Sequence, residues 1–278
     1  MSGPEADWVT GWVPEALPDA VYRSHLVEAA PGRAIFRLPV GRFLLAPDAP
    51  AVVETAAGAS DKDIACMLRG PVGALRSSLG GRFALRASAV EVGRRALVVC
   101  GSTFGVSTLV ASLALRGHRL LADGVVVVSG TPPMVSALPE AGQPRVTLWP
   151  DSAAHLGLDL DQGQVLRPGV GSRLFALGPG GTPAEIGLGW VVSLAVDHKS
   201  EYPDQATSHP FAAVSQRVAT LVGHQWHAEV VAALGLQAEQ FNWAVTIGSA
   251  PMFRLLRSTG SIGLTLPPLA ERAEELAV

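Results

Sequence analysis

The chain has 278 residues, of which 48% are hydrophobic and 16% are charged, and its formal net charge is −3. This length suffices for one large domain or two smaller ones, each with a buried core. The small negative charge gives no electrostatic reason to expect binding to nucleic acid or to an anionic membrane.

The compartment is predicted from the cysteines and from the hydrophobic runs. The two cysteines, Cys66 and Cys100, lie far apart in the sequence, and we expect both to be reduced thiols. The first seven residues are acidic and lack the basic-then-apolar order of a signal peptide. No run of about 18 apolar residues marks a membrane-spanning helix. We therefore expect a cytoplasmic protein.

The N-terminal part combines strands with helices. Residues 18–55 alternate short apolar runs with proline and glycine, a pattern that predicts a small antiparallel element. From Asp61 to Leu79 the apolar spacing predicts helical packing that is interrupted near Gly70-Pro71. We assign residues 1–80 to a small N-terminal β/α element.

The next segment has the strongest local pattern. Its predicted elements are strands at 87–92 and 96–100, a helix at about 107–115, and a pair of buried strands at 120–123 and 125–128. Gly117 is placed to end the helix, because glycine adopts a left-handed conformation without steric strain. The segment therefore predicts a strand, loop, helix and strand unit.

Residues 81–278 are assigned to a second domain that ends in helices. Further predicted elements are a strand at 145–150, a short helix at 151–156, strands at 174–177 and 189–194, and helices beyond Phe211. We expect Trp149 and Trp190 to be core residues of strands. Trp226 and Trp243 lie among histidine and asparagine, which favours a surface that binds an aromatic peptide.

The segment from Cys100 to Leu109 has the order of a phosphate-binding loop without its cation. Such a loop needs a glycine-rich turn, a lysine, and then a serine or threonine that opens a helix. The preceding apolar strand, Gly105 and the Ser107-Thr108 pair are present. Val106 stands where the lysine is expected.

Four segments in order carry a family resemblance. They are Leu85–Val90, similar to the sequence Leu-His-Ala-Ser-Ala-Val, then Cys100–Leu109, Arg116–Asp123, and Thr147–Asp151 with its Leu-Trp-Pro core. From Leu85 onward the chain resembles the HPr kinase-like group, the C-terminal domain of HPr kinase/phosphorylase that is related to phosphoenolpyruvate carboxykinase. The likeness is to stand-alone members associated with ribosomally synthesised, modified peptides. It implies an α/β fold with a mixed sheet and a degenerate phosphate loop.

The departures from that family concern the nucleotide chemistry. Cys100 and Thr103 replace loop glycines, Val106 replaces the lysine, Gly124 replaces the second aspartate, and Arg86 replaces a histidine. Phosphoryl transfer depends on such charges and positions. We therefore expect that ATP-dependent phosphotransfer is lost and that no cofactor is bound.

Two interpretations of the remaining groups stay open. The N-terminus of the helix that begins near Ser107 still favours an anion. The space in front of this helix end could therefore bind a carboxylate such as a peptide C-terminus. Alternatively, Ser107 only caps the helix, while Phe104 and Val106 fill the empty nucleotide space. The candidate ligand-binding residues are Arg86, Ser102, Ser107, Thr108, Trp226 and Trp243.

Asp123 is the candidate catalytic residue. It is either an acid–base group in a desolvated cleft or a hydrogen-bonded remnant at a strand end. His224 and His227 have i, i+3 spacing, but no cysteine or carboxylate completes a recognised ligand pattern, so we expect no metal.

The leading functional hypothesis is a degenerate HPr kinase-like protein that binds a precursor peptide in natural-product biosynthesis. It would present the peptide to partner enzymes, or assist a cyclisation or hydrolysis step. One alternative is an atypical kinase of a peptide or small molecule, with Lys62 or Lys199 as its cation. Another is a pseudoenzyme subunit that stabilises an active homologue. The family resemblance implies a homo-oligomer, for which a dimer is the simplest expectation.

Overall fold

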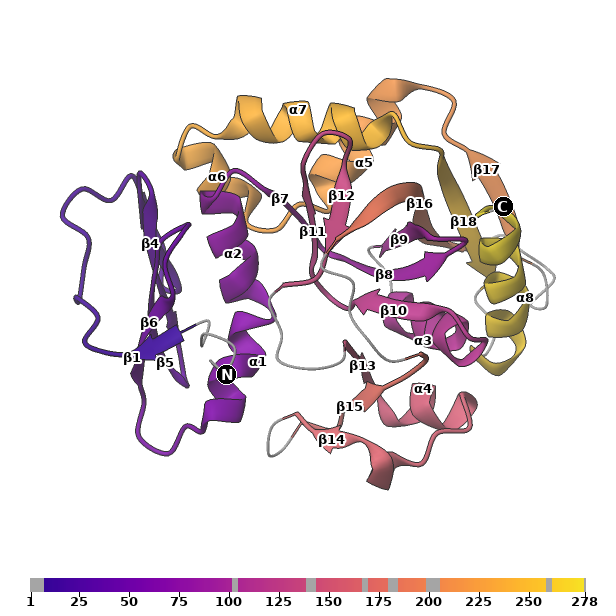
Figure 1. Cartoon of the computed structure of the whole chain (residues 1–278), viewed down its shortest axis with the longest axis horizontal. Coiled ribbons are helices and arrows are strands. Elements are labelled where there is room, and N and C mark those ends of the chain that lie inside the picture. The colour runs from indigo at the N-terminus through magenta and orange to yellow at the C-terminus, as the bar shows by residue number, and fades with distance from the viewer. Residues whose placement is uncertain are drawn as a thin grey trace.

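The structure is a computed structural model that describes residues 8–101, 105–138, 144–166, 170–179, 185–198, 206–258 and 262–277. It has three sheets and the predicted mixed α/β fold is confirmed (Figure 1). No helix in these ranges is both long and apolar enough to cross a membrane. Neither Cys66 nor Cys100 forms a disulfide in the described part of the chain, and Cys100 is buried.

The N-terminal sheet has six strands in the order β1-β6-β5-β4-β3-β2. The strands are β1 (Trp8–Thr10), β2 (Tyr22–Arg23), β3 (Val27–Ala30), β4 (Arg33–Leu38), β5 (Gly41–Leu45) and β6 (Ala51–Thr55). All neighbours are antiparallel except the β1–β6 pair, which is parallel. The antiparallel element predicted for residues 18–55 is therefore confirmed.

Two helices, α1 (Asp61–Leu68) and α2 (Pro71–Leu79), lie between the N-terminal sheet and the rest of the molecule (Figure 1). Ser60 and Asp63 form a capping box that starts α1, because each side chain satisfies a backbone N–H of the other. The predicted break at Gly70-Pro71 separates the two helices. These elements all precede residue 80, and the assignment of 1–80 as a unit stays a prediction.

A nine-stranded mixed sheet forms the centre of the molecule. It contains β7 (Phe83–Leu85), β8 (Ala87–Val92), β9 (Arg95–Gly101), β10 (Arg119–Ala122), β11 (Val126–Ser129), β12 (Met134–Ser136), β16 (Ile186–Asp197), β17 (Thr207–Pro210) and β18 (Met252–Ser258). The prediction that the strands at 120–123 and 125–128 pair with each other is wrong. β10 pairs with β8, whereas β11 pairs with β7 and β12, because Gly124 turns the chain away between them at a φ of +80°.

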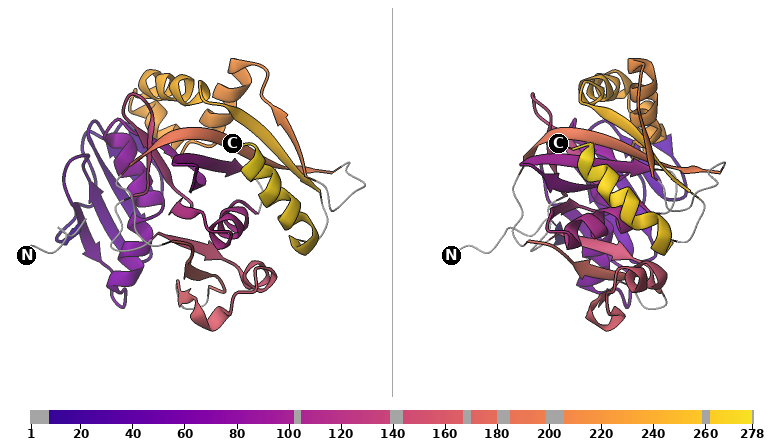
Figure 2. Two further views of the ribbon diagram at one scale, coloured as in Figure 1. Left: turned by 45° about the vertical axis from the view of Figure 1, so that its right-hand side comes forward. Right: turned by 90° about the vertical axis from the view of Figure 1, so that its right-hand side faces the viewer.

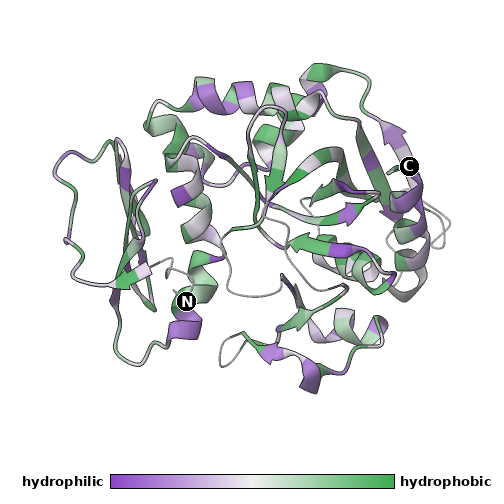
Figure 3. Ribbon diagram, in the orientation of Figure 1, coloured by the Kyte–Doolittle hydropathy of each residue, from purple (hydrophilic) through white to green (hydrophobic). Residues whose placement is uncertain are grey.

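Helices cover both faces of the central sheet (Figure 2). On one face the apolar core contains side chains from α3 (Val106–Leu115) and α8 (Ile262–Glu275). The core of the other face contains side chains from α5 (Val214–Gly223) and α7 (Gln237–Gly248), while α6 (Ala228–Ala233) contacts the N-terminal core through Val230. The central strands are correspondingly apolar along most of their length (Figure 3).

A third, small sheet has the order β13-β15-β14. It consists of β13 (Arg145–Leu148), β14 (Gln164–Val165) and β15 (Arg173–Ala176), together with α4 (Pro150–His155) and a short 3-10 helix (Leu160–Gln162). Val146 and Leu148 pack into the core beside α3. Because side chains alternate along a strand, Arg145 and Thr147 lie on the opposite face.

The prediction that Trp149 is a core residue in a strand is wrong. β13 ends at Leu148, and the Trp149 side chain is 55% exposed. Trp149 precedes Pro150 and forms the N-cap of α4. It also follows Thr147 by two positions, so it continues the face of the strand that points away from the core. Trp190 lies in β16 and packs against the core as predicted.

Candidate functional site

A cavity of about 620 Å³ lies where the N-terminal helices, the central sheet, α3 and the small sheet meet. This volume is within the range of small-ligand sites. Its principal lining residues are Cys66, Met67, Arg69 and Pro71 from the N-terminal helices, Arg86, Ser88 and Trp226 beside the central sheet, Gly105–Thr108 from the start of α3, Asp123, Leu138, and Arg145, Thr147, Trp149, Leu166 and Leu174 from around the small sheet.

The floor of the cavity is formed by Gly105 and the first turn of α3. The N–H of Leu109 donates to the carbonyl of the N-cap residue Gly105. The N–H groups of Val106, Ser107 and Thr108 belong to the first turn, where a helix provides no acceptor of its own. Gly105 adopts a φ of +120°, which favours glycine. The floor therefore presents the N-terminus of a helix, an arrangement that favours an anion, beside the apolar side chain of Val106.

The interpretation of Ser107 as the helix cap is wrong. The N-cap is Gly105, and it makes no side-chain capping bond. Ser107 is instead the second residue of α3, two positions after Gly105, and its side chain forms a hydrogen bond with the Asp123 carboxylate. Val106 lines the cavity, and the interpretation that Phe104 and Val106 fill an empty nucleotide space stays a prediction. Ser102 and Phe104, the other residues in these two interpretations, lie outside the described residues.

Thr108 joins two walls of the cavity. Its side chain is buried, and its hydroxyl donates a hydrogen bond of 3.1 Å to Ser152 Oγ on α4. This bond holds α4 and the small sheet against α3. Thr108 therefore offers a ligand its backbone N–H, while its hydroxyl is engaged within the protein.

Asp123 follows β10 and is held by donors from two sheets. Ser88 Oγ donates to Asp123 Oδ1 (2.6 Å), and the N–H of Thr147 donates to Oδ2 (2.9 Å). Burial raises the pKa of this carboxyl, and the hydrogen bonds from Ser88, Thr147 and Ser107 partly oppose that rise. Because both oxygens already accept hydrogen bonds from the protein, the geometry favours a structural link over a free acid–base group.

Arg86 and Trp226 form the cationic and aromatic part of the site. The Arg86 guanidinium lies 5.0 Å from the centroid of the Trp226 ring, a cation–π distance. Trp226 Nε1 donates to the Gly124 carbonyl (3.1 Å), and the backbone N–H of Arg86 donates to the His224 carbonyl (2.7 Å). These bonds fix the indole at the cavity wall and leave the exposed guanidinium able to meet a ligand.

The pKa values of two histidines next to this pair, His224 and His227, are affected by the Arg86 charge. Burial lowers the pKa of His224 and His227, and the nearby Arg86 charge lowers both further. His227 Nε2 lies 2.7 Å from the Pro71 carbonyl oxygen. No group of three or more potential metal ligands occurs among the described residues.

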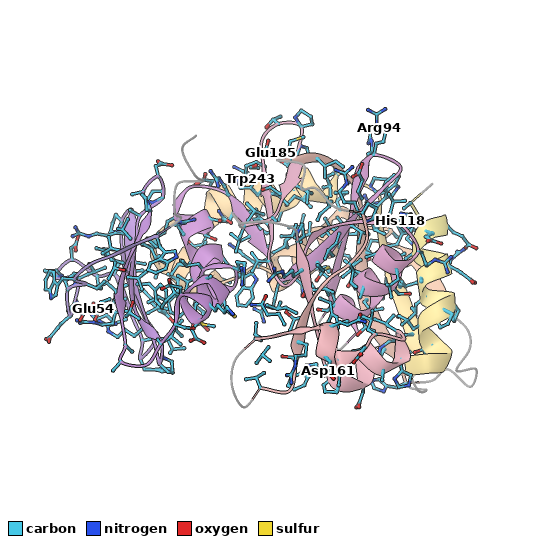
Figure 4. The ribbon with its side chains drawn as sticks, turned by 60° about the horizontal axis from the view of Figure 1, so that its bottom comes forward. Glu54, Arg94, His118, Asp161, Glu185 and Trp243 are labelled. Carbon is cyan, nitrogen blue, oxygen red and sulfur yellow. The ribbon has the colours of Figure 1, made fainter. Side chains whose placement is uncertain are left out.

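Trp243 (labelled in Figure 4) lies on α7 and does not line this cavity. Its Nε1 donates to the Gly81 carbonyl (2.8 Å), and its ring packs against the core on that face of the central sheet. We therefore leave Trp243 out of the site proposed below, whereas Arg86, Ser107, Thr108, Asp123 and Trp226 all line the cavity.

Comparisons with known proteins give distant likenesses among solved structures. No protein-family model and no curated protein matches the chain. Among solved structures 39 chains match. One is the HPr(Ser) kinase/phosphatase from Coxiella burnetii, which is 13% identical, with a TM-score of 0.35 over 69% of this chain and 87% of that chain. The similarity is distant, so the site is interpreted from its own residues.

Several cavity residues carried no functional assignment in the sequence analysis. Side chains alternate between the two faces of a strand. Val146 and Leu148 lie on the core face of β13, so the alternation places Arg145, and Trp149 directly after the strand, on the other face. This alternation could have indicated both residues as cavity residues. Met67 and Leu166 gave none, because only long-range packing brings α1 and the segment after β14 to the same cavity.

Proposed function

We propose that the chain is a degenerate HPr kinase-like protein that binds a peptide and does not transfer phosphate from ATP. The terminal carboxylate of the peptide occupies the floor of the cavity, where it meets the N–H groups at the start of α3 and the Arg86 guanidinium. A large apolar or aromatic side chain lies against Trp226 and the apolar wall. The bound peptide is presented to a partner biosynthetic enzyme, or held for a cyclisation or hydrolysis step.

The open cavity with an apolar Val106 in its floor is the observation that carries this proposal. An isopropyl group cannot neutralise the outer phosphates of ATP, and the floor lacks the second carboxylate because position 124 is glycine. A single carboxylate needs less charge compensation. Donated N–H groups and one guanidinium are typical partners for it.

The lysines offer little support for the kinase alternative. The chain has two lysines, Lys62 and Lys199. Lys62 is exposed on α1 and does not line the cavity. Lys199 lies outside the described residues.

The proposal is tested with a library of acetylated hexapeptides that carry a free C-terminal carboxylate. Calorimetry on the tightest binder and on its C-terminal amide should show that the amide binds about ten- to a hundred-fold more weakly, because a charge-assisted hydrogen bond contributes about 1.5–3 kcal/mol. Magnesium ATP should give no binding heat. Binding of ATP, phosphate transfer that is lost in Lys199→Ala, or the absence of any binding peptide would contradict the proposal.

A substitution at Arg86 should show whether the peptide carboxylate binds this guanidinium in particular or responds only to the overall charge of the protein. We expect Arg86→Gln to weaken binding of the selected acid peptide roughly ten-fold and to leave binding of its amide nearly unchanged. Arg94→Gln is the matched control, since Arg94 lies at the tip of the β8–β9 hairpin (Figure 4), is exposed and does not line the cavity. Equal losses in the two variants would argue against a carboxylate at Arg86.

A further inference from the structure

Arg145 is a further cation of the cavity, besides Arg69 and Arg86, and lies on the wall formed by the small sheet. It opens β13, and its pairing partner on β15 is Ala176. Val146 and Leu148 occupy the core face of this strand, so Arg145 and Thr147 share the other face. The backbone N–H of Thr147 donates a hydrogen bond to the Asp123 carboxylate. Both Arg145 and Thr147 line the cavity.

The charge of Arg145 is not balanced by a carboxylate within the described residues. Its side chain is half-buried, and its hydrogen-bond partner is the neutral Gln164 Oε1 on β14. Asp123, the carboxylate that lines the cavity, already accepts hydrogen bonds from Ser88 and Thr147. A half-buried charge without a counter-ion in the part of the chain that the structure describes favours a ligand that brings an anion.

The surroundings of Arg145 indicate what kind of anion this is. Leu166, Leu174 and Trp149 line the same part of the cavity, and Leu174 lies on β15 opposite Thr147. An inorganic anion would gain nothing from these side chains. A carboxylate on a short side chain, next to an apolar residue, would contact both the guanidinium and the apolar surface.

We infer that Arg145 forms a second anion subsite, so that the bound peptide carries an acidic side chain in addition to its terminal carboxylate. This inference rests on the proposed function and specifies its substrate class as an acidic peptide with a large apolar residue. The overall charge of the chain is −3, so attraction of an acidic peptide depends on the local arginines of the cavity and not on the protein as a whole.

The hexapeptide library tests this inference through a double-mutant cycle. The selected peptides should be enriched in aspartate or glutamate. Exchange of that residue for its amide counterpart should weaken binding to the wild-type protein about ten-fold and should hardly change binding to Arg145→Gln. The Arg86→Gln variant should remain sensitive to this exchange, because it acts on the terminal carboxylate.

The outcomes separate the two proposals. If peptides bind through their terminal carboxylate but acidic residues are not enriched, or if Arg145→Gln stays as sensitive to the exchange as the wild-type protein, the second subsite is refuted and the proposed function stands. If no hexapeptide binds, the proposed function fails and the subsite fails with it. Arg173→Gln is a suitable control, since Arg173 lies on β15 of the same small sheet and does not line the cavity.

Discussion

Asp123→Ala should lower the free energy of unfolding by about 3 kcal/mol. The substitution leaves the buried Ser88 hydroxyl and the Thr147 N–H without their acceptor, and each unsatisfied buried group costs about 1–3 kcal/mol. It also releases the small sheet from the central sheet. Urea denaturation at pH 7 measures the change.

Asp123→Asn is the matched substitution and should be close to neutral at pH 7. Its carbonyl oxygen can accept from the Thr147 N–H, and its amide can donate to Ser88 Oγ. If the alanine and asparagine variants lose equal stability, the two hydrogen bonds do not carry the effect and this account of Asp123 is wrong.

The same pair of proteins tests the ionisation of Asp123. Burial raises the pKa of this carboxyl above its ordinary value of 3.8, so the folded state holds the proton more tightly than the unfolded state. Between that ordinary value and the raised pKa, the contribution of Asp123 to stability falls as pH rises. The stability of the wild-type protein relative to Asp123→Asn should therefore decline with pH across that window, and a flat difference would contradict the raised pKa.

Gly73→Ala should lower the free energy of unfolding by about 2–3 kcal/mol, although alanine is the better helix former. Gly73 lies in the first turn of α2. A Cβ there would clash with the carbonyl oxygen of Leu68 and would lie 2.9 Å from Leu138 Cδ1. Because Leu138 lines the cavity, we expect peptide affinity to fall as well.

Gly223→Ala provides the control for Gly73→Ala. Gly223 is the last residue of α5, it is exposed, and a Cβ there meets no atom within 4 Å. The same chemical change should raise the free energy of unfolding by about 0.5–1 kcal/mol. Thermal or urea denaturation of both variants should give opposite signs, and a loss of stability in both would refute the steric explanation for Gly73.

Local features of the fold could be predicted from the sequence because their causes are local. The break at Gly70-Pro71, the turn at Gly93-Arg94 and the end of α3 at Gly117 each follow from residues that determine their own backbone conformation. The hydrophobic spacing of α3 likewise depends on neighbours within one helix.

Strand partners could not be predicted in the same way. β10 and β11 are consecutive and apolar, yet each pairs with a different strand, because pairing is decided by packing across the whole sheet. Trp149 shows a different kind of error. Trp149 follows Thr147 by two positions, and this spacing indicates the face of the strand that points away from the core. The apolar side chain of Trp149 instead favoured the wrong prediction of a core position.

The candidate site was predictable only in part. The start of α3, Arg86 and Asp123 belong to one segment whose pattern indicated a phosphate-loop frame, and all of them line the cavity. The walls formed by Met67 on α1 and by Arg145 on β13 come from segments on either side of it in the sequence. Their convergence depends on tertiary packing, which no local pattern encodes.

The central claim is that a peptide carboxylate binds where a kinase would hold phosphate. Nuclear magnetic resonance of the ¹⁵N-labelled protein tests it most directly. Addition of the selected hexapeptide acid should shift the backbone amides of Val106, Ser107 and Thr108 and the side-chain Nε of Arg86, and its C-terminal amide should shift them far less. Magnesium ATP should leave them unchanged. The claim is contradicted if ATP shifts these amides, or if the acid and the amide shift them equally.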